Sequence, residues 1–213
     1  MPAPAIKICG ISTSDTLAAV IAARAEHVGF NFHAPSPRCV TIAQAQALGA
    51  QAKGRIGRVG LFVDAPDAAL DEAVSTGAID VLQLHGDESP ARVAELRNRF
   101  GLPVWKVIGV AGAPDLDRAH NYVGAADLVL LDARTPAGSL PGGMGLKFDW
   151  GLLAQWKAPL PWGLAGGLNP GNVAEAIAAT GAPLVDAASG VERAKGVKDP
   201  ALIAQFCAAV RNA

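Results

Sequence analysis

The sequence has few cysteines, few aromatic residues and little net charge, and each scarcity excludes a class of protein. Cys9, Cys39 and Cys207 are odd in number and lack any paired spacing typical of zinc ligands. We therefore expect reduced thiols in a cytoplasmic protein, without a disulfide framework or a metal site. With a formal net charge of −1 and a sequence pI near 6.4, the chain offers no basic surface for nucleic acid.

Long hydrophobic runs are also missing. The alanine-rich segments are interrupted by charges, glycines or prolines well short of the roughly 20 residues that span a bilayer. The first residues, Met1-Pro2-Ala3-Pro4, lack the basic segment of a secretory signal. We therefore expect no membrane partner. The chain is nevertheless 51% hydrophobic, with a mean hydropathy of +0.28 over 213 residues, which predicts one large core in a single domain over residues 1–213.

Short apolar runs alternate with amphipathic segments along the whole chain. Eight such units in just over 200 residues predict an α/β protein of the (β/α)₈ TIM barrel type, with a doubly wound open sheet as the alternative. The expected strand and helix pairs are 5–9 with 15–25, 27–32 with 42–53, 58–63 with 67–76, 81–85 with 90–100, 104–110 with 115–125, 128–132 with 148–157, 162–165 with 172–180, and 184–187 with 201–212.

Two chemically capable residues end predicted strands. Cys9 closes the apolar run from Ala5, and Asp132 closes the run from Leu128. In a barrel, the carboxyl ends of all strands meet on the face where active sites lie. Because side chains alternate along a strand, Lys7 and Cys9 share one face, as do Leu130 and Asp132. We expect an acid–base pair, with the Lys7 ammonium lowering the pKa of Cys9 and favouring its thiolate.

Two glycine-containing strand exits predict a phosphate site. Gly166 and Gly167 end the seventh strand before Asn169-Pro170, which is typical of a helix start. Ser189 and Gly190 follow the eighth strand and are expected to begin a short helix. In barrels of this type, the loops after strands seven and eight often hold phosphate through backbone N–H groups, which glycine leaves accessible. A third cluster, 141–145, contains Gly143 and Gly145 and is expected to fold over the ligand.

A cation is placed to bind a second anionic group. Arg38 follows Ser36-Pro37 in the loop after the second predicted strand. Its guanidinium group can bind a planar carboxylate through two parallel hydrogen bonds. The predicted ligand is therefore a small phosphorylated molecule that is anionic at both ends.

An ordered set of short motifs carries a family resemblance over nearly the whole chain. The motifs are Lys7-Ile8-Cys9-Gly10-Ile11, Gly29-Phe30-Asn31-Phe32, Ser36-Pro37-Arg38, Gly60-Leu61-Phe62-Val63, Leu82-Gln83-Leu84-His85-Gly86, Leu130-Leu131-Asp132, Gly142-Gly143-Met144-Gly145, Phe148-Asp149-Trp150, Leu164-Ala165-Gly166-Gly167-Leu168, Ser189-Gly190-Val191-Glu192 and Gly196-Val197-Lys198-Asp199. In these motifs the chain resembles the phosphoribosylanthranilate isomerases.

The resemblance implies a function and a set of roles. It implies an Amadori rearrangement of N-(5-phosphoribosyl)anthranilate to 1-(2-carboxyphenylamino)-1-deoxyribulose 5-phosphate in tryptophan biosynthesis, without metal or organic cofactor. Asp132 would be the general acid and Cys9, as a thiolate, the general base. Arg38 would hold the anthranilate carboxylate, and the glycine loops the phosphate. Asp186 is a weaker candidate for ligand binding, and we expect a monomer or a homodimer.

The sequence departs from the common family pattern where Met144 and Ala188 replace frequent hydroxyl residues, which leaves phosphate contacts to backbone amides. Gln83 and His85 share a strand face, and we expect a satisfied polar pair there. In isolation, Cys9 is more often a small buried hydrophobe than a catalyst.

Three alternative functions remain open on the residues alone. A ribulose-phosphate epimerase would need metal ligands that the sequence does not display. The related isomerase of histidine biosynthesis would use aspartates in both proton-transfer roles, against which Cys9 argues. A phospholigand-binding protein would need the glycines and Arg38 but neither Cys9 nor Asp132.

Overall fold

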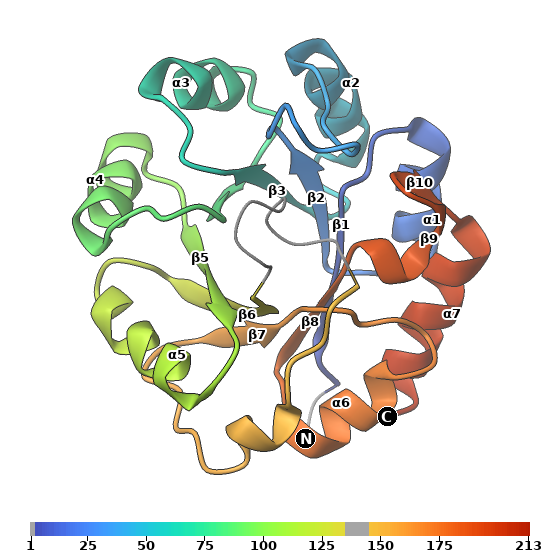
Figure 1. Cartoon of the computed structure of the whole chain (residues 1–213). Coiled ribbons are helices and arrows are strands. Elements are labelled where there is room, and N and C mark those ends of the chain that lie inside the picture. Colours follow the sequence, from blue (N-terminus) through green and yellow to red (C-terminus); the bar gives the residue numbers. More distant parts are fainter. Residues whose placement is uncertain (1–2, 135–144) are drawn as a thin grey trace.

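Eight parallel strands form a closed barrel, in chain order, in a computed structural model that describes residues 3–134 and 145–213 (Figure 1). The last strand pairs with the first, Lys7 lying opposite Asp186, so the ring closes without an edge. The predicted barrel is therefore confirmed. The strands are β1 Ala5–Cys9, β2 His27–Asn31, β3 Gly57–Phe62, β4 Val81–Leu84, β5 Val104–Val110, β6 Leu128–Ala133, β7 Trp162–Leu164 and β8 Leu184–Ala187.

Helices cover the outside of the ring (Figure 1). They are α1 Ser14–Ala22, α2 Ile42–Ala52, α3 Asp67–Ser75, α4 Pro90–Phe100, α5 Ala113–Asp117, α6 Val173–Thr180 and α7 Pro200–Arg211, with 3₁₀ turns η1 Arg118–Tyr122, η2 Trp150–Leu153 and η3 Ser189–Val191. A two-stranded hairpin, β9 Glu192–Ala194 with β10 Val197–Lys198, follows η3. Among the described residues, no helix combines the length and the apolarity needed to cross a bilayer.

Two predicted helices differ from the structure. The segment expected to be helical over 148–157 forms only the short turn η2, which starts at a capping bond from the N–H of Gly151 to the Asp149 side chain at 2.8 Å. Gly151 disfavours helix, and prolines 159 and 161 prevent its continuation. The helix expected over 115–125 begins earlier, at Ala113, and passes into η1 after Asp117. The sixth β/α unit thus has no α-helix among its described residues.

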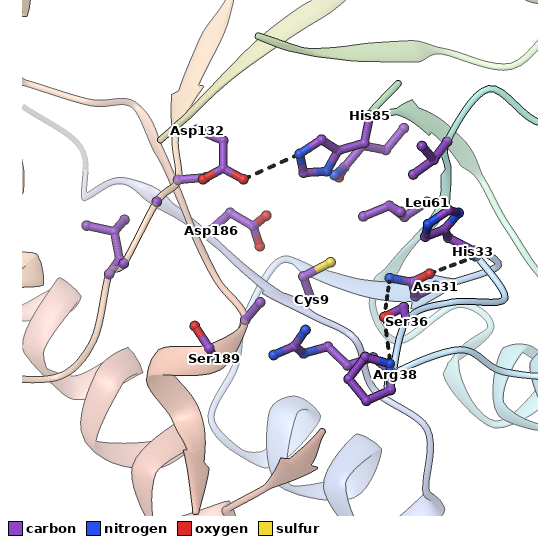
Figure 2. Close-up of a pocket in the computed structure, with 18 of the residues that line it drawn as sticks. Cys9, Asn31, His33, Ser36, Arg38, Leu61, His85, Asp132, Asp186 and Ser189 are labelled. Carbon is purple, nitrogen blue, oxygen red and sulfur yellow. Dashed lines mark hydrogen bonds and ion pairs between the residues drawn. The ribbon is translucent and has the colours of Figure 1, made fainter. Parts of the chain in front are cut away.

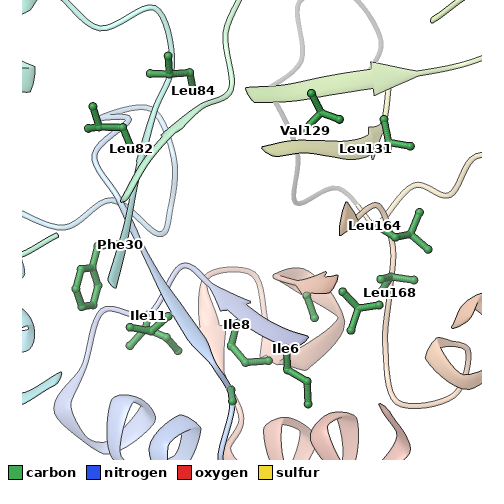
Figure 3. Close-up of a cluster of buried hydrophobic side chains, with 14 of the residues drawn as sticks. Ile6, Ile8, Ile11, Phe30, Leu82, Leu84, Val129, Leu131, Leu164 and Leu168 are labelled. Atoms are coloured by element: carbon green, nitrogen blue, oxygen red, sulfur yellow. The ribbon is translucent and has the colours of Figure 1, made fainter. Parts of the chain in front are cut away.

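Side-chain alternation along the strands divides the apolar residues into two layers. A small cluster fills the barrel interior, and its members are Val59, Val81, Trp105, Val107, Leu130, Ala165 and Leu184. A larger cluster lies between the strands and the helices, and Figure 3 shows part of it, including Ile6, Ile8, Phe30, Leu82 and Val129. This alternation decides which strand-end residues face into the barrel mouth.

One buried ion pair ties the loops after β3 and β4 to β5. The Lys106 side chain points out of the barrel and is 1% exposed. Its Nζ lies 3.0 Å from Glu88 Oε2 and donates to the Gly86 carbonyl at 2.7 Å. Glu88 in turn accepts the backbone N–H groups of Asp64, at 2.9 Å, and of Gly86. The pair therefore fixes the two loops that border the barrel mouth.

This pair predicts a large stability effect. Glu88→Gln keeps the side-chain shape but leaves the Lys106 charge buried without a counterion, so we expect the free energy of unfolding to fall by about 3–5 kcal/mol. The matched control is Glu95→Gln, whose partner Arg92 is also solvent-accessible and whose loss should cost less than about 1 kcal/mol. Urea denaturation measures both, and equal effects would contradict the assigned role of the buried pair.

Candidate active site

A cavity of about 240 Å³ opens at the carboxyl ends of the strands (Figure 2). Its wall includes Cys9 from β1, Asn31 from β2, Asp132 from β6 and Asp186 from β8, together with Arg38 from the loop after β2. Each strand residue occupies an inward position of the period-two alternation. The structure therefore brings together the predicted Cys9, Asp132, Arg38 and Asp186 around one cavity.

Cys9 is held in a tight space at the end of β1. The side chain is 5% exposed, and Gly29 lies beside it as its neighbour in the parallel pairing of β1 with β2. A methyl group on Gly29 would lie 2.9 Å from Cys9 Sγ and 3.3 Å from Lys7 Nζ. Glycine at position 29 therefore leaves room for the sulfur and the ammonium group. The sequence motif contains this glycine, but only the structure shows why it is needed.

Burial raises the pKa of Cys9 above its ordinary value, because it outweighs the attraction of Lys7 for the thiolate. The Lys7 ammonium acts in the expected direction and favours the thiolate, but its effect is smaller than that of burial. Lys7 is completely buried, and its Nζ lies 2.9 Å from Asp186 Oδ2. Although burial opposes the ammonium charge of Lys7, Asp186 and Cys9 overcome it and raise the pKa of Lys7. The cation is thus shared between two acidic groups.

Asp132 faces the cavity from β6. Its Oδ1 accepts the backbone N–H of Ala133 at 2.8 Å, and its Oδ2 lies 3.4 Å from His85 Nε2 (Figure 2). Gly166 leaves room for the Asp132 carboxylate, because a methyl group at that position would lie 3.1 Å from Asp132 Oδ1.

The predicted polar pair between Gln83 and His85 is not formed. Gln83 Oε1 and His85 Nδ1 both lack a hydrogen-bond partner within the described chain.

A turn after β2 presents Arg38. Asn31 accepts the N–H of His33 at 2.8 Å and donates to Ser36 Oγ at 3.2 Å, and Ser36 Oγ also accepts the Arg38 N–H (Figure 2). Asn31 and His33 also line the cavity, although neither was predicted as a site residue. Period-two alternation along β2 places Asn31 on the inward face, whereas His33 lies beyond the end of that strand, in the turn.

The Arg38 guanidinium group makes a two-pronged ion pair that the sequence did not predict. Its Nε and Nη2 donate to Glu192 Oε1 and Oε2 at 2.7 and 2.9 Å, and Lys198 Nζ donates to Glu192 Oε1 at 2.8 Å. Burial would raise the pKa of Glu192, but hydrogen bonds and charge from Arg38 and Lys198 outweigh it and lower that pKa to about 2. The hairpin β9–β10 therefore fixes the orientation of the Arg38 guanidinium group.

Three glycine-containing loops meet beside Arg38. A methyl group on Gly190 would lie 1.9 Å from the Leu168 carbonyl oxygen, and one on Gly167 would lie 2.7 Å from the Gly145 carbonyl oxygen. These loops line a second hollow with Ser189, and they place Gly166, Gly167, Ser189, Gly190 and Gly145 on one side of the site. Gly143 and Met144 lie outside the described residues.

The seventh loop differs in one detail from its prediction. Asn169 was expected to cap the following helix, but its side chain accepts the N–H of Gly171 at 2.8 Å within a turn. Asn172 occupies the capping position, and α6 begins at Val173. The N–H of Asn169 is itself bound by Asn172 Oδ1. The short helix expected after β8 is present as η3.

Comparison with known proteins gives matches over nearly the whole chain. The family model described as N-(5'phosphoribosyl)anthranilate (PRA) isomerase matches residues 6–209. The N-(5'-phosphoribosyl)anthranilate isomerase of Mesorhizobium japonicum is 51% identical over 209 residues, which cover 98% of this chain and 95% of the relative.

Solved structures agree with this match. The phosphoribosyl anthranilate isomerase of Thermotoga maritima is similar with a TM-score of 0.88 and 31% identity, covering 99% of this chain and 100% of that one. A phosphoribosyl anthranilate isomerase in complex with reduced 1-(o-carboxyphenylamino)-1-deoxyribulose 5-phosphate has a TM-score of 0.86 and 29% identity, with the same coverage.

The Glu192 network predicts a pH-dependent stability. Because its pKa is lowered from 4.5 to about 2 in the folded chain, ionised Glu192 stabilises the fold above pH 4.5, and this contribution is lost as the pH falls towards 2. We expect Glu192→Gln to lower the free energy of unfolding by about 2–3 kcal/mol at pH 7.

The difference between Glu192→Gln and wild type should shrink towards zero between pH 4.5 and pH 2 in urea titrations. The exposed Glu72→Gln is the control and should differ little from wild type at any pH. A Glu192→Gln difference that stays constant with pH would refute the assigned ionisation.

Proposed function

The chain belongs to the family of N-(5'-phosphoribosyl)anthranilate isomerases, and we propose that the cavity at the barrel mouth is where it carries out the reaction of that family. It is an isomerase of tryptophan biosynthesis. The reaction converts N-(5-phosphoribosyl)anthranilate into 1-(2-carboxyphenylamino)-1-deoxyribulose 5-phosphate. The observation that carries the assignment is that Cys9 and Asp132, from strands distant in the sequence, line the same small cavity.

Asp132 and Cys9 divide the proton transfers between them. Asp132 protonates the ring oxygen of the ribose, so that the ring opens to a Schiff base, and the Cys9 thiolate removes the proton from C2 of the sugar. The resulting enolamine tautomerises to the aminoketone. Asp132 suits this work because one oxygen is fixed by the Ala133 N–H while the other faces His85 and the cavity. Cys9 suits it because its sulfur is directed into the cavity (Figure 2).

Two anchors hold the substrate across this pair. Arg38 binds the anthranilate carboxylate, and Glu192 keeps its guanidinium group in a fixed plane at the cavity wall. The phosphate is bound on the side where the loops containing Gly166, Gly167, Ser189 and Gly190 converge, with Gly145 at the rim. Anchoring both ends places the reacting carbons between the acid and the base. The reacting groups are then held in the orientation that proton transfer requires.

The chain acts as a single domain over residues 1–213, in the cytoplasm, as a monomer or a homodimer, on a small phosphorylated molecule and without a cofactor. A relative from Thermotoga maritima is described as dimeric. The side chains of the cavity supply both an acid and a base, so the proton transfers need no group beyond those that the chain provides.

The acid and the base can be tested separately from binding. Replacing Cys9 with Ser or Asp132 with Asn removes one proton-transfer group, so kcat should fall by about 100- to 10,000-fold while substrate still binds. Cys39→Ser is the matched control, because Cys39 is not among the residues lining the cavity, and it should retain kcat. Fluorescence assays of turnover measure the rates. Wild-type binding without turnover would favour a phospholigand-binding protein instead.

The space around Cys9 gives a second test. Gly29→Ala places a methyl group 2.9 Å from the position of Sγ, so the sulfur must move, and we expect kcat to fall by about 100-fold in the fluorescence assay. Gly109→Ala on β5 is the control, since its methyl group would meet nothing closer than 3.5 Å. If both alanine variants keep wild-type kcat, the position of the sulfur does not limit the reaction.

A further inference from the structure

Three buried ionisable groups lie together at the junction of β1 and β8. Lys7 and Cys9 share the inward face of β1, and Asp186 faces Lys7 across the β1–β8 pairing. Asp186 Oδ2 accepts a hydrogen bond from Lys7 Nζ. The other oxygen, Oδ1, is buried and has no partner among the described residues. Figure 2 shows the Asp186 carboxyl group and the Cys9 sulfur directed towards the same part of the cavity. Nothing in the mechanism above uses this oxygen.

The mechanism also leaves a proton without a destination. The base must be a thiolate, yet burial favours the neutral thiol. Cys9 is 5% exposed, and a bound substrate would close off the remaining access to solvent. A proton acceptor inside the site would remove this difficulty. An unpartnered carboxylate oxygen beside the thiol is chemically able to serve as that acceptor.

We propose that Asp186 is the internal acceptor of the Cys9 proton. The Sγ–H bond breaks and an Oδ1–H bond forms, either directly or through one water molecule in the cavity, while the electron pair of the broken bond stays on sulfur. Before the transfer the group contains Lys7 ammonium, Asp186 carboxylate and Cys9 thiol. Afterwards it contains Lys7 ammonium, neutral Asp186 and Cys9 thiolate. The net charge is zero in both states, so no charge has to be buried or released.

The surroundings of the pair favour this exchange. Burial, together with the charge of Asp132 on β6, raises the pKa of Asp186, although Lys7 and Lys198 oppose this. Lys7 on β1 and Lys198 on β10 both attract the thiolate. Further titratable groups near the cluster are His27 on β2, whose charge couples to Lys7, and His85, which faces Asp132. Glu192 binds Lys198 and Arg38, and His33 and Lys195 line the same cavity. Two ammonium groups thus stabilise the sulfur anion that the transfer creates.

The inference rests on Cys9 being the base, and it predicts an unusual pH dependence. If Asp186 takes the proton, kcat/KM of the wild type does not require proton loss to solvent. In Asp186→Asn the thiol must release its proton to solvent, so its activity should rise by about tenfold per pH unit below the thiol pKa. We therefore expect the ratio of Asp186→Asn to wild-type kcat/KM to increase between pH 6 and pH 8.

The ratio removes the titration of the substrate itself, which both proteins share. Asp71→Asn, on the outer face of α3 in an exposed ion pair, should give a ratio independent of pH. A constant ratio for Asp186→Asn as well would overturn the inference and leave Asp186 as a structural partner of Lys7. If Cys9→Ser turns over as fast as wild type, the proposed function itself fails, so the two failures are distinguishable.

A second measurement needs no variant that must fold. Iodoacetamide alkylation of the wild-type protein, followed by peptide mass spectrometry, gives the rate at each cysteine. We expect the rate at Cys9 to be nearly constant between pH 6 and pH 8, because its thiolate fraction is set by internal exchange. Cys39 is a half-buried thiol outside the cluster, and burial raises its pKa, so it should react about tenfold faster per pH unit in the same sample. The same tenfold rise at Cys9 would overturn the inference.

Discussion

The pairing of β1 with β8 is the constraint on which the site depends. It closes the ring, and in the same register it sets Lys7 opposite Asp186 and brings Cys9 to the mouth of the barrel. In an open sheet these residues would lie on opposite edges, separated by the width of the sheet. Because every strand runs in the same direction, closure also delivers Asp132 from β6 to the same mouth. The chemistry of this protein is therefore a consequence of ring closure.

Two of the buried ion pairs fix loops at that mouth. Lys106 with Glu88 holds the loops after β3 and β4, and Arg38 with Glu192 connects the loop after β2 to the hairpin that follows β8. Replacing such pairs with apolar residues is often neutral or stabilising, so stability alone does not explain them. The geometry of these ion pairs explains them better. An ion pair with two or more hydrogen bonds restricts loop orientation more narrowly than apolar packing does. A substrate anchored at both ends needs loops in such fixed positions.

The sequence was informative wherever a local rule decides the outcome, and uninformative where distant residues do. Period-two alternation was enough to place Cys9 and Asp132 on inward faces, and the ordered motifs led to the family. The helix expected over 148–157 is absent because Gly151 and the later prolines outweigh its apolar pattern. Glu192 was quoted in a motif, but its partner Arg38 lies 154 residues away, a separation at which no spacing rule operates. The net rise of the Cys9 pKa was not predicted either, because burial is a property of the closed barrel.

The charge balance at the β1–β8 junction also explains why sulfur, and not a carboxylate, occupies position 9. A carboxylate there would stand beside Asp186 with the same sign of charge. Two unit charges about 4 Å apart interact by about 4 kcal/mol at the effective dielectric constant of a protein site. Lys7 is completely buried beside both positions, and it already binds Asp186 at 2.9 Å. A thiol adds no charge until it ionises, so Asp186 can keep its ion pair in the resting site.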